Sequence, residues 1–269
     1  MRIGEALAAS GLEAREARLL LAAACGVGEA NLIARPEIEL AQPAEAKFLD
    51  WAQRRIAGEP VAYLLGEREF YGLALRVTPA VLIPRPETEL LVDLALRLVD
   101  AEREAALLDL GTGSGAIAIA VKHHRPRARV TAVDASEPAL AVARANAARH
   151  RVAVDFRLGR WFAPLAGERF DCVLANPPYV AEGDPHLAQG DLRFEPRGAL
   201  VGGADGLDAI REIVAQAPAH LNTQGWLLVE HGYDQAPAVR ACFERAGFES
   251  VESRSDLSGN FRVTLGRYH

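Results

Sequence analysis

The segment FDCVLANPPYV places hydrogen-bond acceptors directly after an apolar run, at Asn176-Pro177-Pro178-Tyr179. Neither proline has an N–H, so the segment cannot continue a hydrogen-bonded strand, while its carbonyl oxygens stay available to a ligand. The Asn176 side-chain oxygen and the Pro177 carbonyl can accept both protons of a planar NH₂ group, and Tyr179 can pack against that group. One face of the nitrogen then remains open to an electrophile. The plainer interpretation is that the prolines end a strand and Asn176 caps the turn.

A nitrogen held in this way suits methyl transfer. An amide or exocyclic amino nitrogen is a weak nucleophile because its lone pair is delocalised. Acceptors that hold both hydrogens favour the pyramidal nitrogen, and near-attack alignment with an electrophilic methyl group can contribute up to roughly 7–11 kcal/mol. No strong base is needed, since the nitrogen becomes cationic and acidic once it is methylated. We therefore assign Asn176 and Pro177 as the catalytic pair.

A glycine-rich turn lies earlier, in LLDLGTGSGAIAIAV at 107–121. An apolar strand ends there and an apolar helix follows, which is where open α/β sheets bind ligands. Small residues from Gly111 to Gly115 let the backbone approach a nucleotide closely. Asp134 ends the next expected strand, about 20 residues further on, where a carboxylate can bond ribose hydroxyls. The GxGxG spacing differs from the dinucleotide GxGxxG and favours S-adenosylmethionine over NAD, although a purely structural turn is the alternative.

Together these motifs resemble those of class I S-adenosylmethionine-dependent methyltransferases that act on planar amino groups. The wider pattern resembles the release factor glutamine methyltransferase family (PrmC/HemK) from about residue 58 to the last residue. The matching segments are GEPVAYLLGEREFYG at 58–72, LIPRPETE at 82–89, NPPYV at 176–180, DLRFEPRGAL at 191–200, LLVEHG at 227–232 and RVTLGRY at 262–268.

The resemblance implies methylation of the side-chain amide nitrogen (N5) of the glutamine in the Gly-Gly-Gln motif of class 1 peptide chain release factors. S-adenosyl-L-methionine would be the cofactor and S-adenosyl-L-homocysteine the product. Separately, the histidines and cysteines show no metal-ligand spacing, so we expect no metal. The implied substrate-binding residues are Asn176, Pro177, Pro178 and Tyr179. The implied cofactor-binding residues are Gly111, Thr112, Gly113, Ser114, Gly115, Asp134, Trp161 and Asn176.

One position departs from the family pattern. Trp161 suits stacking on adenine, although a tryptophan of the core is the alternative. Many relatives carry an aspartate immediately before this tryptophan, and here the residue is Arg160. Arginine cannot accept a hydrogen bond. Either backbone carbonyls contact the adenine or the cofactor binds more weakly, and we expect Arg160→Asp to leave activity intact or to tighten cofactor binding.

A long irregular stretch, AEGDPHLAQGDLRFEPRGALVGGADG, follows Val180. Loops of this length are uncommon in compact domains and are usually functional. The family pattern predicts a wall around the target glutamine, with Phe194 and Glu195 near it, while a solvated flap is the alternative. Arg85, Glu87 and His231 are left without an assigned role.

The order of elements predicts an α/β protein with a Rossmann-like class I methyltransferase fold. Its doubly wound, mainly parallel sheet has seven strands, and the last is antiparallel because no helix precedes it. We expect residues 1–65 to form a helical domain that docks the release factor, 66–80 a β-hairpin linker and 81–269 the methyltransferase domain. In the first, helices span Glu13–Cys25 and a segment after Pro43 whose apolar side chains include Phe48, Trp51 and Ile56.

Later elements follow from apolar runs, proline and caps. A helix should begin near Glu87, and Ser136 should cap another. The expected strands are 107–110, 130–134, 152–158, 170–175, 226–230, 248–253 and 262–265, and the helices are 116–123, 137–149, one from about 207, and 235–246.

Composition bounds the function. The 269 residues carry 30 basic and 36 acidic side chains, a net charge of −6, which gives no general attraction for nucleic acid or anionic membrane. Cys25, Cys172 and Cys242 have no metal or disulfide spacing and are expected to be buried thiols. LLLAAAC at 19–25 resembles a signal core, but charged residues precede it, so we expect a helix and a cytoplasmic protein. We also expect the protein to be a monomer.

Three rival functions stay open. A glutamine methyltransferase of a ribosomal protein would share both core motifs, although the short N-terminal region favours the release factor. A DNA adenine-N6 methyltransferase would also present an NH₂ group, but it needs a basic surface and a flipped base. A module that binds the cofactor without turnover is the third.

Overall fold

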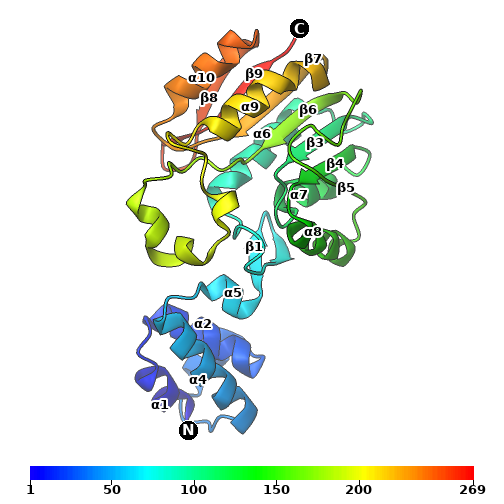
Figure 1. Ribbon diagram of the computed structural model, residues 1–269. Coiled ribbons are helices and arrows are strands. Elements are labelled where there is room, and N and C mark those ends of the chain that lie inside the picture. Colours follow the sequence, from blue (N-terminus) through cyan, green and yellow to red (C-terminus); the bar gives the residue numbers. More distant parts are fainter. The chain divides into compact units, whose positions relative to one another are not determined.

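A seven-stranded sheet carries the segments singled out above (Figure 1). Its strand order is β5-β4-β3-β6-β7-β9-β8. Neighbours from β5 to β7 run parallel, whereas β9 is antiparallel to both β7 and β8. The bounds are β3 (Ala106–Leu110), β4 (Arg129–Asp134), β5 (Asp155–Leu158), β6 (Phe170–Ala175), β7 (Leu221–Glu230), β8 (Glu249–Ser255) and β9 (Phe261–Arg267). The predicted doubly wound sheet with a reversed last strand is confirmed.

The computed structural model describes residues 1–269, which divide into two units. The first unit consists of Met1–Glu67 with Gln189–Phe194, and the second of Arg68–Ala188 with Glu195–His269. The short piece of the first unit therefore comes from the middle of the irregular stretch that follows β6. No helix in the structure is long and apolar enough to cross a membrane.

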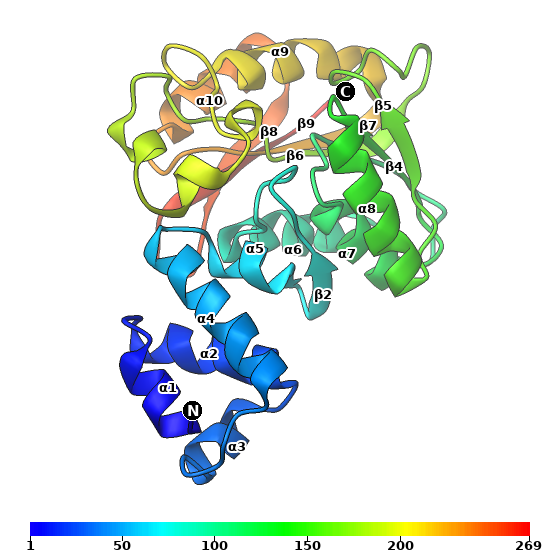
Figure 2. The same cartoon turned by 60° about the horizontal axis from the view of Figure 1, so that its bottom comes forward.

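Helices cover both faces of the sheet in the second unit (Figure 2). Their bounds are α6 (Glu89–Leu98), α7 (Ala116–His124), α8 (Glu137–His150), α9 (Asp208–Gln216) and α10 (Ala236–Arg245). Side chains alternate across β3, so Leu107 packs with α6 and α7 while Leu108 packs with α9 and α10. Because both faces are covered, the central strands read as continuous apolar runs.

The helical unit contains α1 (Ile3–Ala9), α2 (Ala14–Cys25), α3 (Glu29–Ala34), α4 (Gln42–Ile56) and α5 (Val61–Leu65). Gly26, in the left-handed region, ends α2 as predicted. Phe48 and Trp51 of α4 are buried in the core of this unit. One expectation is wrong: Cys25 is only partly buried, because it is the last residue of α2. Ile56, at the last turn of α4, is 62% exposed.

The predicted hairpin forms from β1 (Glu67–Phe70) and β2 (Leu73–Arg76). Its two turn residues, Tyr71 (φ +52°) and Gly72 (φ +75°), are both left-handed, which matches the twist of a tight hairpin. The Tyr71 hydroxyl donates to Asp93 at 2.6 Å and ties the turn to α6.

Two strand boundaries differ from the sequence prediction by three residues or more. β5 begins at Asp155 and not at Val152, because residues 152–154 lead into it from the end of α8. β7 begins five residues earlier than expected, at Leu221. Its first half is irregular, with Gln224 at φ +67° and a register shift against β6 between Phe170 and Cys172. That irregularity breaks the apolar pattern on which the prediction rests.

Candidate active site and cofactor pocket

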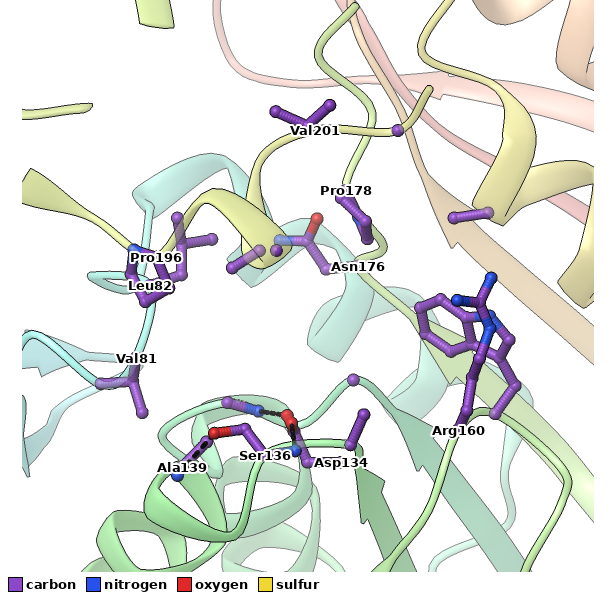
Figure 3. A pocket seen from close by; sticks show the side chains of 18 of the residues that line it. Val81, Leu82, Asp134, Ser136, Ala139, Arg160, Asn176, Pro178, Pro196 and Val201 are labelled. Atoms are coloured by element: carbon purple, nitrogen blue, oxygen red, sulfur yellow. Dashed lines mark hydrogen bonds between the residues drawn. The ribbon is translucent and has the colours of Figure 1, made fainter. Parts of the chain in front are cut away.

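A cavity of about 580 Å³ opens at the carboxyl ends of β3, β4 and β6 (Figure 3). Its size lies within the range of small-molecule sites. Six segments supply its walls: 80–82, the glycine turn, 134–139, 159–161, the segment after β6, and 196–209. The predicted site residues that line it are Gly111, Gly113, Asp134, Trp161, Asn176 and Pro178.

The glycine turn has two different roles. Gly111 (φ +71°) and Gly113 (φ +55°) face the cavity, and a Cβ on Gly111 would lie 3.3 Å from Cζ3 of Trp161. Gly115 (φ +85°) does not line the cavity. Its Cβ would lie 2.8 Å from Cδ1 of Ile119 and 3.2 Å from Cβ of Ala143, so this glycine permits the close packing of α7 on α8.

The other two residues of the turn point into the protein. The Thr112 hydroxyl donates to the buried Asp109 carboxylate at 2.6 Å, and the Ser114 carbonyl accepts from Asn146 at 2.9 Å. Burial raises the pKa of Asp109 to about 7. Thr112 and Ser114 therefore shape the turn from beneath and lie outside the cavity lining.

Asp134 holds two backbone segments together at the cavity wall. Its Oδ2 accepts from Gly113 N at 2.8 Å and its Oδ1 from Ser136 N at 2.9 Å (Figure 3). Burial raises the pKa of Asp134, and the backbone donors oppose that effect. Each oxygen keeps a lone pair that can accept a hydroxyl proton from a ligand.

Trp161 and Arg160 follow β5 and form part of the cavity wall. Trp161 sits at φ +47° and packs on the core of the second unit while it lines the cavity, so both interpretations of this residue apply. Arg160 pairs with Glu212 of α9, and its guanidinium lies 5.8 Å from the Trp161 ring centroid. Its donors are thus turned to a protein carboxylate.

Asn176 comes first after β6, at the carboxyl edge of the sheet. Its Nδ2 donates to the hydroxyl of Thr88 at 3.1 Å. The side-chain oxygen accepts no hydrogen bond from the protein, and it remains available as an acceptor (Figure 3). This is the group that the sequence analysis required for a planar NH₂.

The three residues after Asn176 differ in whether they line the cavity. Pro178 lines the cavity, but Pro177 is buried and Tyr179 is not in the lining. The Tyr179 hydroxyl donates to Glu230 at 3.3 Å, and burial raises the pKa of Tyr179. The structure therefore brings Asn176 and Pro178 to the cavity and directs the tyrosine hydroxyl into a buried polar cluster.

Two of the residues left without an assigned role, Arg85 and His231, have partners in the structure. Arg85 pairs with the buried Glu195 at 2.6 Å. His231 is fully buried, with Nδ1 2.8 Å from the Gly232 carbonyl and Nε2 2.9 Å from the Thr264 hydroxyl. Burial lowers the pKa of His231, so the neutral ring is a structural element.

Sequence analysis missed several wall residues because they are small and apolar. They are Ala80, Val81, Ala135 and Ala139. Their types carry no chemical signal. Leu82, Pro196, Gly198, Ala199 and Val201 also line the cavity, and they lie in segments that the sequence analysis had singled out. Ser136 was recognised as the N-cap of α8, where its hydroxyl accepts from Ala139 N at 3.3 Å.

Comparison with known proteins defines the class first. A family model described as "Methyltransferase small domain" matches residues 88–191, and one described as "PrmC N-terminal domain" matches 2–66. A Pyrococcus furiosus methyltransferase has the same fold, with a TM-score of 0.58 and 19% identity over 81% of this chain and 98% of that one. A T. thermophilus 16S rRNA methyltransferase solved with AdoMet and guanosine also has a TM-score of 0.58, at 18% identity over 76% and 50%. The protein is a methyltransferase.

Curated relatives define the family more closely. Release factor glutamine methyltransferase of Pseudomonas aeruginosa is 52% identical over 94% of this chain and 92% of its own length. The Burkholderia pseudomallei enzyme of that name is 53% identical over 98% and 95%. The chain belongs to the release factor glutamine methyltransferase family.

Proposed function

We propose that the protein transfers the methyl group of S-adenosylmethionine to the side-chain amide nitrogen of the glutamine in the Gly-Gly-Gln motif of class 1 peptide chain release factors. One observation carries the chemistry: Asn176 lines the cavity and donates its Nδ2 to Thr88, which leaves its side-chain oxygen available to accept from a substrate. The names of the curated relatives support the substrate.

The cavity fits the cofactor in three respects. The turn from Gly111 to Gly115 offers backbone close to a ligand, through Gly111 and Gly113 directly and through Thr112, Ser114 and Gly115 as its frame. Asp134 has lone pairs for ribose hydroxyls, and the Trp161 ring offers a face for adenine. S-adenosylmethionine, when bound, supplies an electrophilic methyl group on its sulfonium.

The residues after β6 would hold the substrate. The Asn176 oxygen and the Pro177 carbonyl accept the two amide protons of the glutamine, while Pro178 and Tyr179 flank its planar group. Because both protons are held on one side, the nitrogen presents its free face to the cofactor side of the cavity. Orientation of this kind accounts for much of the rate gain expected of such sites.

The remaining assignments follow from the family. Residues 1–65 dock the release factor, 66–80 form the linker and 81–269 catalyse methyl transfer. The enzyme acts as a cytoplasmic monomer that contacts protein and not nucleic acid directly, in keeping with its net charge of −6.

Mass spectrometry tests the proposal. An unmodified class 1 release factor is incubated with the protein and isotope-labelled S-adenosylmethionine, and the Gly-Gly-Gln peptide is analysed. One labelled methyl group on that glutamine, absent with Asn176→Ala, is the expected result. No label in a sample shown by calorimetry to bind the cofactor would overturn the substrate, and label on ribosomal protein or DNA under the same conditions would identify a rival.

A further inference from the structure

Glu230 is a buried carboxylate that the proposed chemistry does not use. It is the last residue of β7 and only 1% exposed. β6 and β7 run parallel with Ala175 opposite Val229, so the next residue on each strand, Asn176 and Glu230, lie side by side at the carboxyl edge of the sheet. A buried carboxylate costs free energy unless partners hold it, so its neighbours indicate what it does.

Two hydroxyl groups face this carboxylate. The Tyr179 hydroxyl donates to Glu230 Oε1 at 3.3 Å. Thr88, 4% exposed, carries the second hydroxyl; it lowers the pKa of Glu230, whose Oε2 has no other hydrogen-bond partner and can accept the Thr88 proton. A hydroxyl has only one proton. If Thr88 gives that proton to Glu230, its oxygen can only accept from Asn176, which is the direction found in the 3.1 Å bond from Asn176 Nδ2.

We infer that Glu230 is a positioning residue, which through Thr88 fixes the Asn176 amide with its oxygen toward the substrate. The inference rests on the proposed function. The ionised carboxylate can only accept hydrogen bonds, so it sets the donor direction along the chain Glu230, Thr88, Asn176. The same carboxylate accepts the Tyr179 hydroxyl. One buried charge therefore orients Asn176, through Thr88, and Tyr179 directly.

Protonation of Glu230 would remove this order. A neutral carboxyl can donate to Thr88, which can then donate to the Asn176 oxygen, and the amide can turn its NH₂ toward the substrate. An NH₂ facing another NH₂ offers no acceptor for the glutamine protons. The ionised state of Glu230 is therefore the active one.

Burial and the neighbouring groups place the titration of Glu230 near neutral pH. Burial raises the pKa of Glu230 to about 7, and Glu87 acts in the same direction, while the Thr88 and Tyr179 hydroxyls and the Arg262 charge lower it. Arg262 is itself paired with Asp256 at 2.9 Å, and Arg85 also acts on Tyr179. Because the active form is ionised, kcat should fall as the pH falls through about 7.

The test compares Glu230→Gln with the wild-type enzyme at saturating S-adenosylmethionine and release factor. Glutamine keeps the shape but has no titration and donates as well as accepts. We expect kcat to fall by about 10- to 100-fold at pH 8, with the dissociation constant of S-adenosylhomocysteine unchanged and the decline of relative activity below neutral pH absent. Asp171→Asn is the matched control, since this carboxylate accepts from Ala106 N and Asn222 at the opposite end of the same sheet; its pH profile should equal that of wild type.

A second pair of variants tests the link itself. Thr88→Val should lower kcat as Glu230→Gln does, whereas Thr88→Ser, which keeps the hydroxyl, should restore it. Wild-type kcat and an unchanged pH profile in Glu230→Gln, or full activity in Thr88→Val, would overturn the inference. An inactive wild-type enzyme would instead contradict the proposed function, so the two failures are distinct.

Discussion

Arg160 forms an ion pair with Glu212 of α9 while its guanidinium lies 5.8 Å from the ring centroid of Trp161. This ion pair bears on the position at which many relatives carry an aspartate and this chain carries Arg160. The arginine is held at the cavity wall by a protein carboxylate, and that carboxylate would face any acidic residue placed at position 160.

Arg160→Asp is therefore best tested together with Glu212→Gln. The single variant places two carboxylates together and gives up the ion pair, which is 66% exposed on the arginine side and worth at most about 1 kcal/mol. We expect the double variant to bind S-adenosylhomocysteine at least as tightly as wild type by calorimetry, and more tightly than Arg160→Asp alone. A double variant weaker than wild type would show that Arg160 itself contributes to cofactor binding.

Asn176→Ala should remove most of the activity. The change deletes the acceptor for one substrate proton and should lower kcat by about 10²- to 10³-fold, the usual effect of losing one oriented polar group at a reacting centre. Cofactor affinity should fall less, since Asp134 and the glycine turn are untouched. Single-turnover kinetics and calorimetry separate the two effects, and equal losses in both would assign Asn176 mainly to cofactor binding.

Two glycines of the same turn should respond differently to alanine. Gly115→Ala places a Cβ 2.8 Å from Ile119 at φ +85°, and should cost about 2–3 kcal/mol in the free energy of unfolding. Gly113→Ala has no atom within 4 Å of its Cβ, so only the left-handed backbone costs, about 1 kcal/mol. Urea denaturation compares them, and equal losses would contradict the packing role of Gly115.

Asp109 should make the fold less stable as the pH rises. Burial raises the pKa of Asp109 to about 7, above its value in the unfolded chain. The folded state therefore binds this proton more tightly than the unfolded chain does. The resulting contribution to the free energy of unfolding is fully present below the pKa of the unfolded chain and is lost as the pH rises through about 7. Asparagine does not titrate, so the free energy of unfolding of Asp109→Asn, relative to that of wild type, should increase by about 1–2 kcal/mol as the pH rises from 5 to 8. A pH-independent difference would rule this effect out.

Sequence patterns predicted the strands of the sheet and the residues at their carboxyl ends that line the cavity. Strands such as β6 are buried on both faces, and their apolar runs end sharply at polar or small residues. Asp134 and Asn176 stand at such ends, so their shared edge followed directly from parallel strands. The reversal of β9 followed from the missing helix before it.

Other features depend on contacts between distant segments. Thr88 and Asn176 are far apart in sequence and meet only because α6 packs beneath β6 and β7, so their hydrogen bond had no local signal. Glu230 looked like the polar end of a strand, and its burial comes from residues on other elements. The strand order, with β9 inserted between β7 and β8, also required the structure.

The segment Gln189–Phe194 belongs to the helical unit, although residues on both sides of it belong to the sheet unit. Within the helical unit, Arg55 pairs with Asp191 at 3.0 Å and with Glu16 at 2.9 Å, and Arg193 donates to the Ala57 carbonyl at 2.6 Å. The polypeptide therefore passes between the units three times. The helical unit is therefore not encoded by residues 1–67 alone. A chimera that exchanges residues 1–67 between relatives must exchange 189–194 as well, because otherwise Arg55 would face position 191 of a different sequence.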